Sequence, residues 1–470
     1  MHNPCINGPS YASNPRKTPP LICARGPISA TELAALLRVN RTTIARTLPD
    51  FGDELVTLGA TRSTRYVLRR GIRNSGSRWP LYRIDAEVRA AEWAELEALH
   101  ERSWRVNWEG TAPEWAGLFT EPNGLWSGFP FFLGDVRPQG FLGRAIASQI
   151  SRTLRLPEDP RFWSDEDVLI YHEAAGEDLP GNGVLGDVCL RRALARSADL
   201  PGADVISQAE RETFYPQRAL EIAQSMPGSS AGGEQPKFLT TVRNEAAEYQ
   251  AVLVKFSAPM DQATGQRWAD LLLCEYHAHQ VLAEVGLATP GAHLLDAGGR
   301  RFFEVPRFDR NGPSGRRGVV SLEALASSLL GALSRNWLEA TAQLHQRGLI
   351  DDGSLSTIQR LYAFGELIGN TDMHYGNLAF FLDDALPFRV APAYDMLAML
   401  WAPGNQGELI ARQFVPAPPL PAMIEPWREA ASWAENFWDR VSGDPRLSPE
   451  FTLLAREGSA MVRQLRRHVR

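Results

Sequence analysis

One segment limits what this chain can fold into more than any other. It runs from Gly369 to Asn377, with the sequence GNTDMHYGN, and is followed eighteen residues later by Asp395. This spacing supplies an aspartate, an asparagine five residues on and a second aspartate beyond an apolar stretch. Such a set can hold a hydroxyl and Mg²⁺ for phosphoryl transfer. Oxygen ligands suit Mg²⁺, so the spacing predicts Asp372 as the catalytic base and Asn377 and Asp395 as metal ligands.

The residues between these polar groups predict how they could meet. Two short apolar runs, 377–382 and 388–391, have the pattern of a β-hairpin, which would return Asp395 to the neighbourhood of Asn377. Apolar residues at helical spacing upstream predict a helix that ends at the catalytic loop. Taken alone, the motif is equally compatible with Asn370, Asp372 and Asn377 capping turns, as Asn and Asp often do.

Two upstream elements favour nucleotide binding over turn capping. The glycine- and serine-rich loop 227–237 precedes a predicted strand, and the exposed N–H groups of such a loop can cradle phosphate. The β-rich run 251–256 carries Lys255, in the way that a kinase strand lysine meets nucleotide phosphates. In isolation Lys255 would suit an edge strand as a charge that discourages aggregation. Residues 268–287 predict a buried helix, from which Glu275 could pair with Lys255.

In combination these segments resemble the HipA-type toxin kinases, a bacterial serine/threonine kinase family with a two-lobed, protein-kinase-like fold. Residues 233–237 look like the family's loop ending in Q-x-K, and residues 302–310 look like its E-R-F-D-R hinge. Residues 370–374 look like its N-T-D-x-H catalytic loop, and 135–144 match its N-terminal region more weakly. The resemblance implies an α+β fold with a strand-rich N-lobe and a helical C-lobe.

The resemblance also implies ATP and Mg²⁺ as cofactors and a protein substrate phosphorylated on serine or threonine. Asp372 would be the base, Asn377 and Asp395 would bind the metal, and Lys255 would contact the phosphates. The remaining implied nucleotide-binding residues are Gly232, Gly233, Gln235, Lys237, Val305, Phe308 and His374, of which His374 is also expected to brace the catalytic loop. Ser230 falls where the family carries a serine that the kinase phosphorylates on itself, and Ser229 is an equally close candidate.

The N-terminal part differs in charge from the rest of the chain. Residues 23–83 hold eleven arginines and four acidic residues, a formal charge of +7, whereas the whole chain carries −6. Ser29 and Glu32 have the spacing of a capping box, and residues 41–48 look like a recognition helix. Residues 55–58 and 65–68 predict two strands joined by a basic tip. The pattern is typical of a winged helix-turn-helix.

Duplex DNA is the partner expected for such a module. The expected contacts are Arg41, Thr42, Thr43 and Arg46 in the major groove, and Arg62, Arg65, Arg69 and Arg70 at the phosphates. A small helical module that binds protein through a solvated arginine face is the alternative. Fusion of a winged helix to this kinase is similar to the YjjJ branch of HipA-like proteins, whereas other members receive their DNA-binding part from a separate antitoxin. A separate antitoxin is therefore a further candidate partner of this chain.

Length and composition agree with several domains. The chain has 470 residues, 44% of them hydrophobic and 22% charged, with no apolar run near the ~18 residues that span a membrane. The expected organisation is a flexible tail at 1–22, a winged helix-turn-helix at 23–85, a linker helix and N-lobe at 86–310, and a helical C-lobe at 311–470. The linker helix is expected at 86–104. Four scattered cysteines indicate a reducing cytoplasm, and the lack of a long apolar run indicates no membrane partner.

The sequence thus predicts an ATP-dependent serine/threonine kinase of HipA-like toxin type, fused to a DNA-binding domain that would let it control its own promoter. Two alternatives remain open. One is a DNA-binding regulator whose kinase-like part binds nucleotide without turnover. The other is a kinase that acts on a small metabolite.

We expect the isolated segment 23–85 to bind duplex DNA with a steep salt dependence, because arginines that neutralise phosphates release counterions. A gel-shift titration over a range of salt concentrations measures this. Absent retardation at low salt, or retardation that salt does not weaken, would contradict the DNA-binding assignment.

Overall fold

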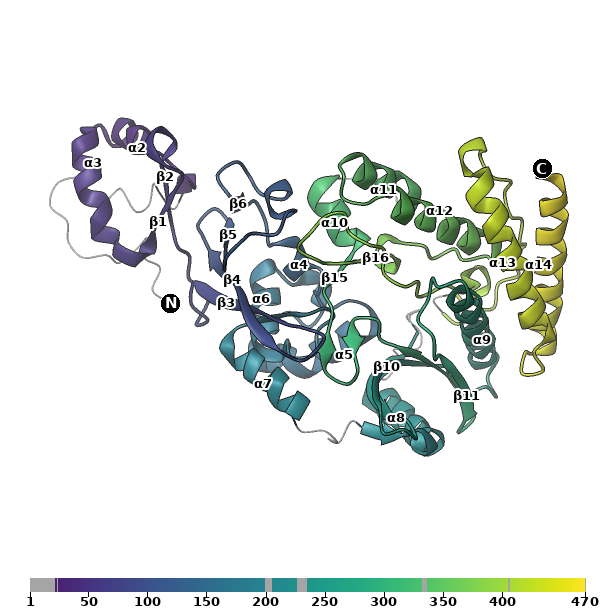
Figure 1. Cartoon of the computed structure of the whole chain (residues 1–470). Coiled ribbons are helices and arrows are strands. Elements are labelled where there is room, and N and C mark those ends of the chain that lie inside the picture. Colours follow the sequence, from purple (N-terminus) through teal and green to yellow (C-terminus); the bar gives the residue numbers. More distant parts are fainter. Residues whose placement is uncertain are drawn as a thin grey trace.

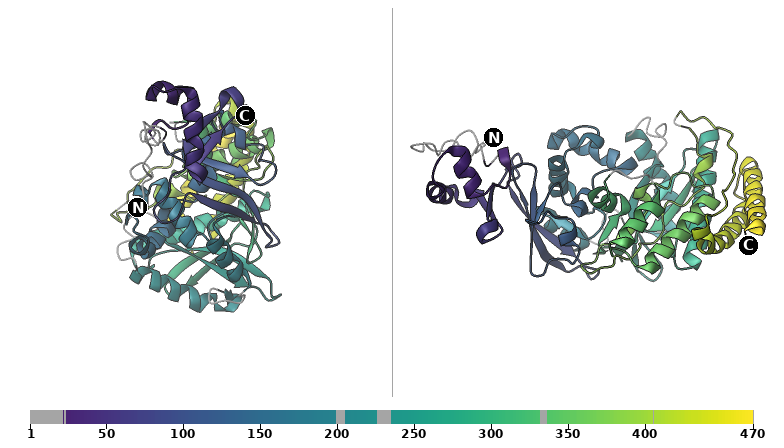
Figure 2. Two further views of the ribbon diagram at one scale, coloured as in Figure 1. Left: turned by 90° about the vertical axis from the view of Figure 1, so that its left-hand side faces the viewer. Right: turned by 90° about the horizontal axis from the view of Figure 1, so that it is seen from above.

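The computed structural model describes residue 22 and residues 24–198, 205–225, 235–331, 336–404 and 406–469. It is a mixed α+β molecule whose parts follow one another along a long axis. The N-terminal helices lie at one end and the C-terminal helices at the other (Figures 1 and 2). The predicted tail, apart from Ile22, lies outside the described residues. So do residues 227–234 of the predicted phosphate loop, which include Gly232, Gly233 and the predicted modification sites Ser229 and Ser230.

The N-terminal part contains two short helices and a two-stranded antiparallel sheet. These elements are α2 (Ala30–Leu37), α3 (Arg41–Thr47), β1 (Leu55–Leu58) and β2 (Arg65–Leu68). The predicted capping box is confirmed, because Ser29 Oγ accepts from the Glu32 amide and the Ser29 amide donates to the Glu32 carboxylate. Arg38, in the left-handed conformation with φ of 55°, ends α2 and turns the chain into α3.

The middle part is a five-stranded antiparallel sheet with four helices (Figure 1). The strand order is β6 (Leu125–Trp126), β5 (Trp104–Trp108), β4 (Ala90–Ala98), β3 (Arg78–Ile84) and β7 (Gly183–Leu185). The helices are α4 (Phe131–Gly134), α5 (Gly140–Leu154), α6 (Asp165–Ala175) and α7 (Asp187–Ala198). Strand β3 starts before the predicted boundary at residue 85 and pairs with β4, so it belongs to this sheet.

The expected linker helix over residues 86–104 is wrong. Residues Ala90–Ala98 of this segment form strand β4, which pairs with β3 on one side and β5 on the other. The three-residue spacing of apolar side chains suggested a helix, but Ala94, Leu96 and Ala98 alternate and are all buried on one face. Cross-strand pairing on two sides overrides the helical composition of a segment this short.

The next part is the strand-rich lobe, a five-stranded sheet between two helices. Its strand order is β11 (His293–Ala297), β12 (Arg300–Pro306), β10 (Tyr249–Phe256), β9 (Lys237–Arg243) and β8 (Val205–Ser207). One face packs on α8 (Arg211–Ser225), and α9 (Ala263–Glu284) covers the other. Val254 and Phe256 point to the α8 side, so the pleat directs Lys255 to the opposite side.

The last part is helical, as predicted. It contains α10 (Leu322–Leu329), α11 (Trp337–Gln346), α12 (Asp352–Leu367), α13 (Ile424–Gly443) and α14 (Pro449–His468). Strands β15 (Val319–Ser321) and β16 (Ala379–Phe381) pair beside them, and β13 (Arg310–Asn311) pairs with β14 (Gly315–Arg316). One continuous apolar core joins these helices to the middle sheet, from Trp79 and Trp104 to Phe364 and Trp438. No helix within the described ranges combines the length and apolarity that crossing a bilayer requires.

Arginines connect the N-terminal part to the middle part. Arg69 donates to the buried carboxylate of Glu97 at 2.7 Å, and Arg73 donates to Asp167 at 2.6 Å. Arg70 is paired with Glu166. The expectation that Arg69 and Arg70 meet DNA phosphates is therefore wrong, because both guanidinium groups are directed at carboxylates of the middle part.

We expect Glu97→Ala to lower the free energy of unfolding by about 3–5 kcal/mol, because it removes the buried carboxylate with which Arg69 and Arg105 pair. Thermal and urea unfolding of the full chain measure the change. Glu92→Ala, on the exposed part of the same strand, is the matched control. Equal stability of the two variants would show that the Glu97 pairs contribute little.

Candidate active site

The catalytic loop begins where α12 ends, and one asparagine joins it to the second aspartate. Asn370 donates from Nδ2 to the carbonyl of Asp395 at 3.2 Å, and its Oδ1 accepts from the Asp372 amide at 3.1 Å. Asn377 Nδ2 donates to the Asp372 carbonyl at 2.8 Å. The structure therefore brings together the two segments that the sequence predicted to converge.

The predicted hairpin between these segments is confirmed. The Phe381 amide donates to the Arg389 carbonyl at 2.9 Å, and the Ala391 amide donates to the Ala379 carbonyl at 2.8 Å. At its end Tyr394 donates its hydroxyl to the Gly376 carbonyl at 2.7 Å. These bonds hold the start and the end of the hairpin side by side.

Lys255 lies at the centre of a buried charge cluster. Its Nζ contacts the carboxylates of Glu275 on α9 and Asp395 after the hairpin. Lys255 and Glu275 are each only 4% exposed. The predicted pairing of Lys255 with Glu275 is confirmed, and the cluster links the strand-rich lobe to the segment that carries the metal-ligand candidates.

The pKa shifts follow from burial and from these pairs. Burial alone would lower the pKa of Lys255, but the attraction of Asp395 and Glu275 outweighs it and raises that pKa. Burial would raise the pKa of Asp395, yet Lys255 and then Lys237 hold it below its usual range. Burial raises the pKa of Glu275, which the charge of Lys255 only partly offsets. Lys255 and Asp395 are consequently a charged pair at neutral pH.

The backbone at Asp395 is also unusual. Its φ of 55° lies in the left-handed region, which residues other than glycine adopt mainly when they are Asn or Asp. Such a conformation persists only where surrounding contacts fix it. Here the carbonyl is held by Asn370 and the carboxylate by Lys255.

Asp372 differs from Asp395 in its surroundings. The residue is exposed at the edge of the site. Partial loss of water around its carboxylate raises its pKa, and the negative charge of Asp395 acts in the same direction while His374 opposes it. A raised pKa brings a carboxylate closer to the range in which a general base works.

His374 braces the loop, as expected. Its ring Nδ1 accepts from the Gly376 amide at 3.0 Å, and its carbonyl accepts from Trp337 Nε1 at 2.9 Å. Gln235 likewise has a structural contact, because its Nε2 donates to the Phe256 carbonyl at 2.7 Å. Neither side chain lines the cavity described next.

A cavity of about 470 Å³ lies between the two lobes, a volume in the range of small-molecule sites. Five of the predicted site residues line it: Lys237, Lys255, Val305, Phe308 and Asp395. Asp372 and Asn377 are outside the lining, but hydrogen bonds of their loop reach Asp395. The strand lysines, the hinge and the second aspartate thus share one cleft.

The polar groups near Asp395 suit a hard cation that is completed by phosphate oxygens. Among the described residues, no three His, Cys, Asp or Glu side chains gather into a ready-made metal site. Mg²⁺, however, commonly uses one or two carboxylates together with substrate phosphates and water. Asp395 supplies a carboxylate, and Asn377, whose Nδ2 is engaged, keeps its amide oxygen for a ligand. The residues present therefore fit Mg²⁺.

The sequence did not reveal the contacts of two carboxylates whose hydrogen-bond partners lie far away along the chain. Glu304, just before the hinge, is buried and accepts from Arg211 Nε at 2.6 Å and from the Tyr215 hydroxyl at 2.5 Å. Asp135 accepts from the Ser321 amide at 2.7 Å. Both residues lie in segments that resemble the HipA family, but their partners are about ninety or more positions away along the chain, so no local motif predicts these contacts.

Known proteins match nearly the whole chain. Residues 75–194 match the family described as YjjJ-like toxin, middle domain, and residues 229–441 match the HipA-like C-terminal domain. Toxin YjjJ of Escherichia coli (strain K12) is 35% identical over 450 residues, covering 95% of this chain and 97% of that protein. This chain belongs to the YjjJ-like toxins. The resemblance to HipA-type proteins is confirmed by the same matches.

Two solved structures are more distant neighbours of this YjjJ-like toxin. One is HipA of Shewanella oneidensis MR-1 in a complex with HipB and its operator DNA, with a TM-score of 0.49 and 15% identity, covering 83% of this chain and 97% of that one. The other is the Helicobacter pylori proinflammatory kinase CtkA, with a TM-score of 0.33 and 12% identity, covering 49% of this chain and 90% of that one.

We expect Lys255→Met to lower the free energy of unfolding of this YjjJ-like toxin by about 3–5 kcal/mol, because it leaves two neighbouring carboxylates without a cation. The double variant Lys255→Met with Glu275→Leu should recover part of the loss. Denaturant unfolding of the three proteins measures both effects. A single variant as stable as the parent would contradict the cluster's contribution.

Proposed function

We propose that this YjjJ-like toxin is an ATP- and Mg²⁺-dependent kinase that phosphorylates serine or threonine in a protein substrate. The observation that supports it most is the contact of Lys255 with both Glu275 and Asp395 in one cleft. A strand lysine paired with a helix glutamate is the arrangement that protein kinases use to hold nucleotide phosphates. A purely structural cluster would not need to line a cavity between two lobes.

The nucleotide would lie with its base at the hinge and its phosphates at the lysines. Val305 and Phe308 line the cavity at the end of β12, and the backbone there would hold adenine. Lys255 and Lys237 are cross-strand partners on β10 and β9, so both ammonium groups would face the phosphates. Gly232 and Gly233 would add backbone N–H groups, and Ser230 or Ser229 would be the site of self-phosphorylation.

Asn377 and Asp395 would hold Mg²⁺. The ion, when bound, neutralises the charge that develops on the phosphoryl oxygens. Asp395 would exchange its contact with Lys255 for the cation, and Lys255 would keep Glu275 while it binds phosphate.

Asp372 would act as the general base. It would accept the proton of the substrate hydroxyl as the oxygen bonds to the γ-phosphorus, while the bond from that phosphorus to the β,γ-bridging oxygen breaks and ADP leaves. Its exposure at the edge of the cleft leaves room for a protein segment, and its raised pKa favours proton acceptance. Asn370 and Asn377 fix the backbone on both sides of the carboxylate.

The N-terminal part would be a winged helix-turn-helix that binds duplex DNA, so that the toxin controls its own promoter. Arg41, Thr42, Thr43 and Arg46 are exposed on α3, which supports their entry into the major groove. Arg65 is partly engaged by Glu32 at 3.4 Å and would still reach phosphate at the surface. The side chain of Arg62 lies outside the described residues. An antitoxin is the further partner that we propose for a toxin of this family.

We place the toxin in the reducing cytoplasm, in agreement with two buried cysteines, Cys189 and Cys274, that form no disulfide.

One observation favours a second candidate function. Asp395 is held by Lys255, and a chain in which this contact persists would bind nucleotide without transferring phosphate. It would then be a DNA-binding regulator with a catalytically silent kinase-like domain.

The deciding experiment is incubation of the full chain with γ-labelled ATP and Mg²⁺. We expect labelled protein, and a loss of at least about a hundredfold in Asp372→Asn, because a general base contributes 10²–10⁴-fold. Asp352→Asn, whose side chain is 98% exposed, is the matched control and should transfer label normally. Nucleotide binding without transfer by the parent chain would support the silent regulator instead.

A further inference from the structure

The cavity between the lobes has a third wall that a two-lobed kinase does not explain. It comes from the middle part, the region that matches the YjjJ-like toxin middle domain. Its residues in the lining include Arg137, Gln139, Leu142, Ile146, Leu179 and Pro180. Leu142 and Ile146 lie on α5, and α5 packs against β9 of the strand-rich lobe. The middle part therefore borders the cleft from the hinge to the strand that carries Lys237.

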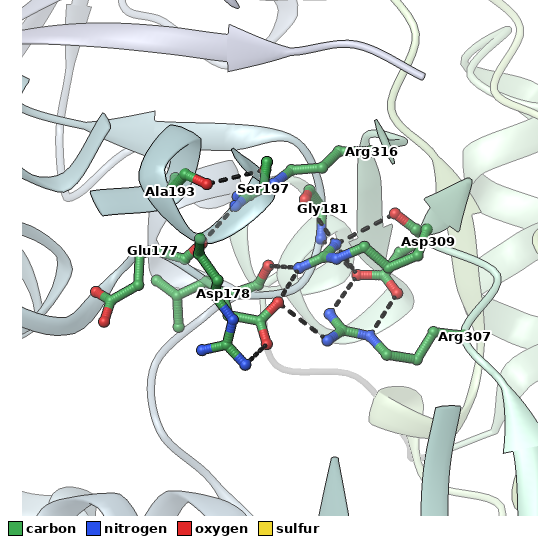
Figure 3. A network of polar contacts seen from close by, with 11 residues as sticks. Glu177, Asp178, Gly181, Ala193, Ser197, Arg307, Asp309 and Arg316 are labelled. Carbon is green, nitrogen blue, oxygen red and sulfur yellow. Dashed lines mark hydrogen bonds and ion pairs between the residues drawn. The ribbon is translucent and has the colours of Figure 1, made fainter. Parts of the chain in front are cut away.

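Buried ion pairs attach this wall to the hinge (Figure 3). Asp178 lies beside Leu179 and accepts from Arg307 Nη1 at 3.2 Å and from Arg310 Nη2 at 2.8 Å. Arg307 in turn donates to both carboxylate oxygens of Asp309, at 3.0 and 2.9 Å. The two hinge arginines thus share two carboxylates, one from the hinge and one from the middle part.

Backbone groups of the same loop complete the attachment. Arg310 donates to the carbonyls of Leu179 and Gly181, at 2.8 and 3.1 Å. The Gly181 amide donates to Asp309 at 3.0 Å. Since Leu179 and Pro180 line the cavity, the bonds that fix the hinge also fix the position of the wall.

The charges show why Asp178 matters to the hinge. Arg316 lies in the same network, and its guanidinium has a buried nitrogen without a hydrogen-bond partner. Burial, together with repulsion from Arg310 and Arg307, lowers the pKa of Arg316 to about 10. The cluster is already rich in positive charge, so removing Asp178 would leave Arg307 and Arg310 to compete for Asp309.

The middle part also contacts the C-lobe away from the hinge. Trp115 Nε1 donates to the Asp383 carbonyl at 2.9 Å, at the tip of the hairpin that precedes Asp395. The Glu114 amide donates to the Asp384 carbonyl at 2.9 Å. Contacts at the hinge, at β9 and at the hairpin hold this wall in a fixed position against both lobes.

We propose that the middle domain forms the outer wall of the nucleoside pocket, with Leu142 in contact with the bound nucleoside and Asp178 positioning the hinge that receives the base. This inference rests on the proposed function, since it names the part of the cleft that selects the nucleotide. A middle domain with only a packing role would leave nucleotide affinity unchanged when its cavity-facing side chains are altered.

A fluorescent ATP analogue titrated against the full chain tests the wall. We expect Leu142→Trp, which fills the cavity, to weaken binding roughly tenfold or more. Gln149→Trp adds the same ring to the exposed face of the same helix and should bind like the parent. Leu142→Trp binding as tightly as Gln149→Trp overturns the wall.

The positioning role of Asp178 has its own readout. Asp178→Asn should raise KM for ATP several-fold while kcat at saturating ATP stays within about twofold, and Asp178→Glu should restore KM. Asp159→Asn, which removes an exposed pair with Arg161, is the control. An unchanged KM, or a fall in kcat alone, overturns the positioning role. If Asp178→Asn does not fold, the Leu142→Trp comparison still decides the wall.

Failure of the proposed function looks different. In that case the parent chain itself would transfer no label, whether or not it binds the analogue. A parent chain that binds the analogue, with variants that bind equally well, overturns only the inference about the middle domain.

Discussion

A buried ammonium with two carboxylates determines how this molecule is assembled. Lys255 is nearly inaccessible to water, and an unpaired charge in that position would cost several kcal/mol or force deprotonation. Glu275 and Asp395 supply the opposite charge, from a helix of the strand-rich lobe and from the segment after the hairpin of the helical lobe. The two lobes must therefore meet at this lysine, and the cleft forms where they meet.

The middle domain extends the same principle to the rim of the cleft. It shares an apolar core with the helical lobe, so the two are packed as one unit. Its polar contacts include ion pairs at the hinge through Asp178 and a hydrogen bond at the hairpin tip through Trp115. Apolar packing attaches the middle domain to the helical lobe, and the ion pairs fix its orientation because their geometry is specific.

The sequence predicted which polar residues gather at the candidate site better than it predicted the surroundings of that site. Lys255, Glu275, Asp372, Asn377 and Asp395 were found because spacing within a loop, a strand or a helix is local information. Asp178 pairs with Arg307 and Arg310, which lie more than a hundred positions away along the chain, so no local pattern reveals its contacts. The linker helix failed for a related reason: Ala94 to Ala98 became a strand because two neighbouring strands pair with it, and strand pairing depends on the whole sheet.

The elongated arrangement of the parts has a spatial consequence (Figures 1 and 2). Helix α3 lies at one extremity, whereas the residues of the cavity lie in the central region between the strand-rich and helical lobes. Arg69, Arg70 and Arg73 attach the N-terminal part to the middle part. The described residues of the N-terminal part do not fold over the region of the cavity (Figures 1 and 2). A ligand bound to helix α3 would not cover the mouth of the cleft. A single molecule therefore has room for one ligand at α3 and another in the cleft at the same time.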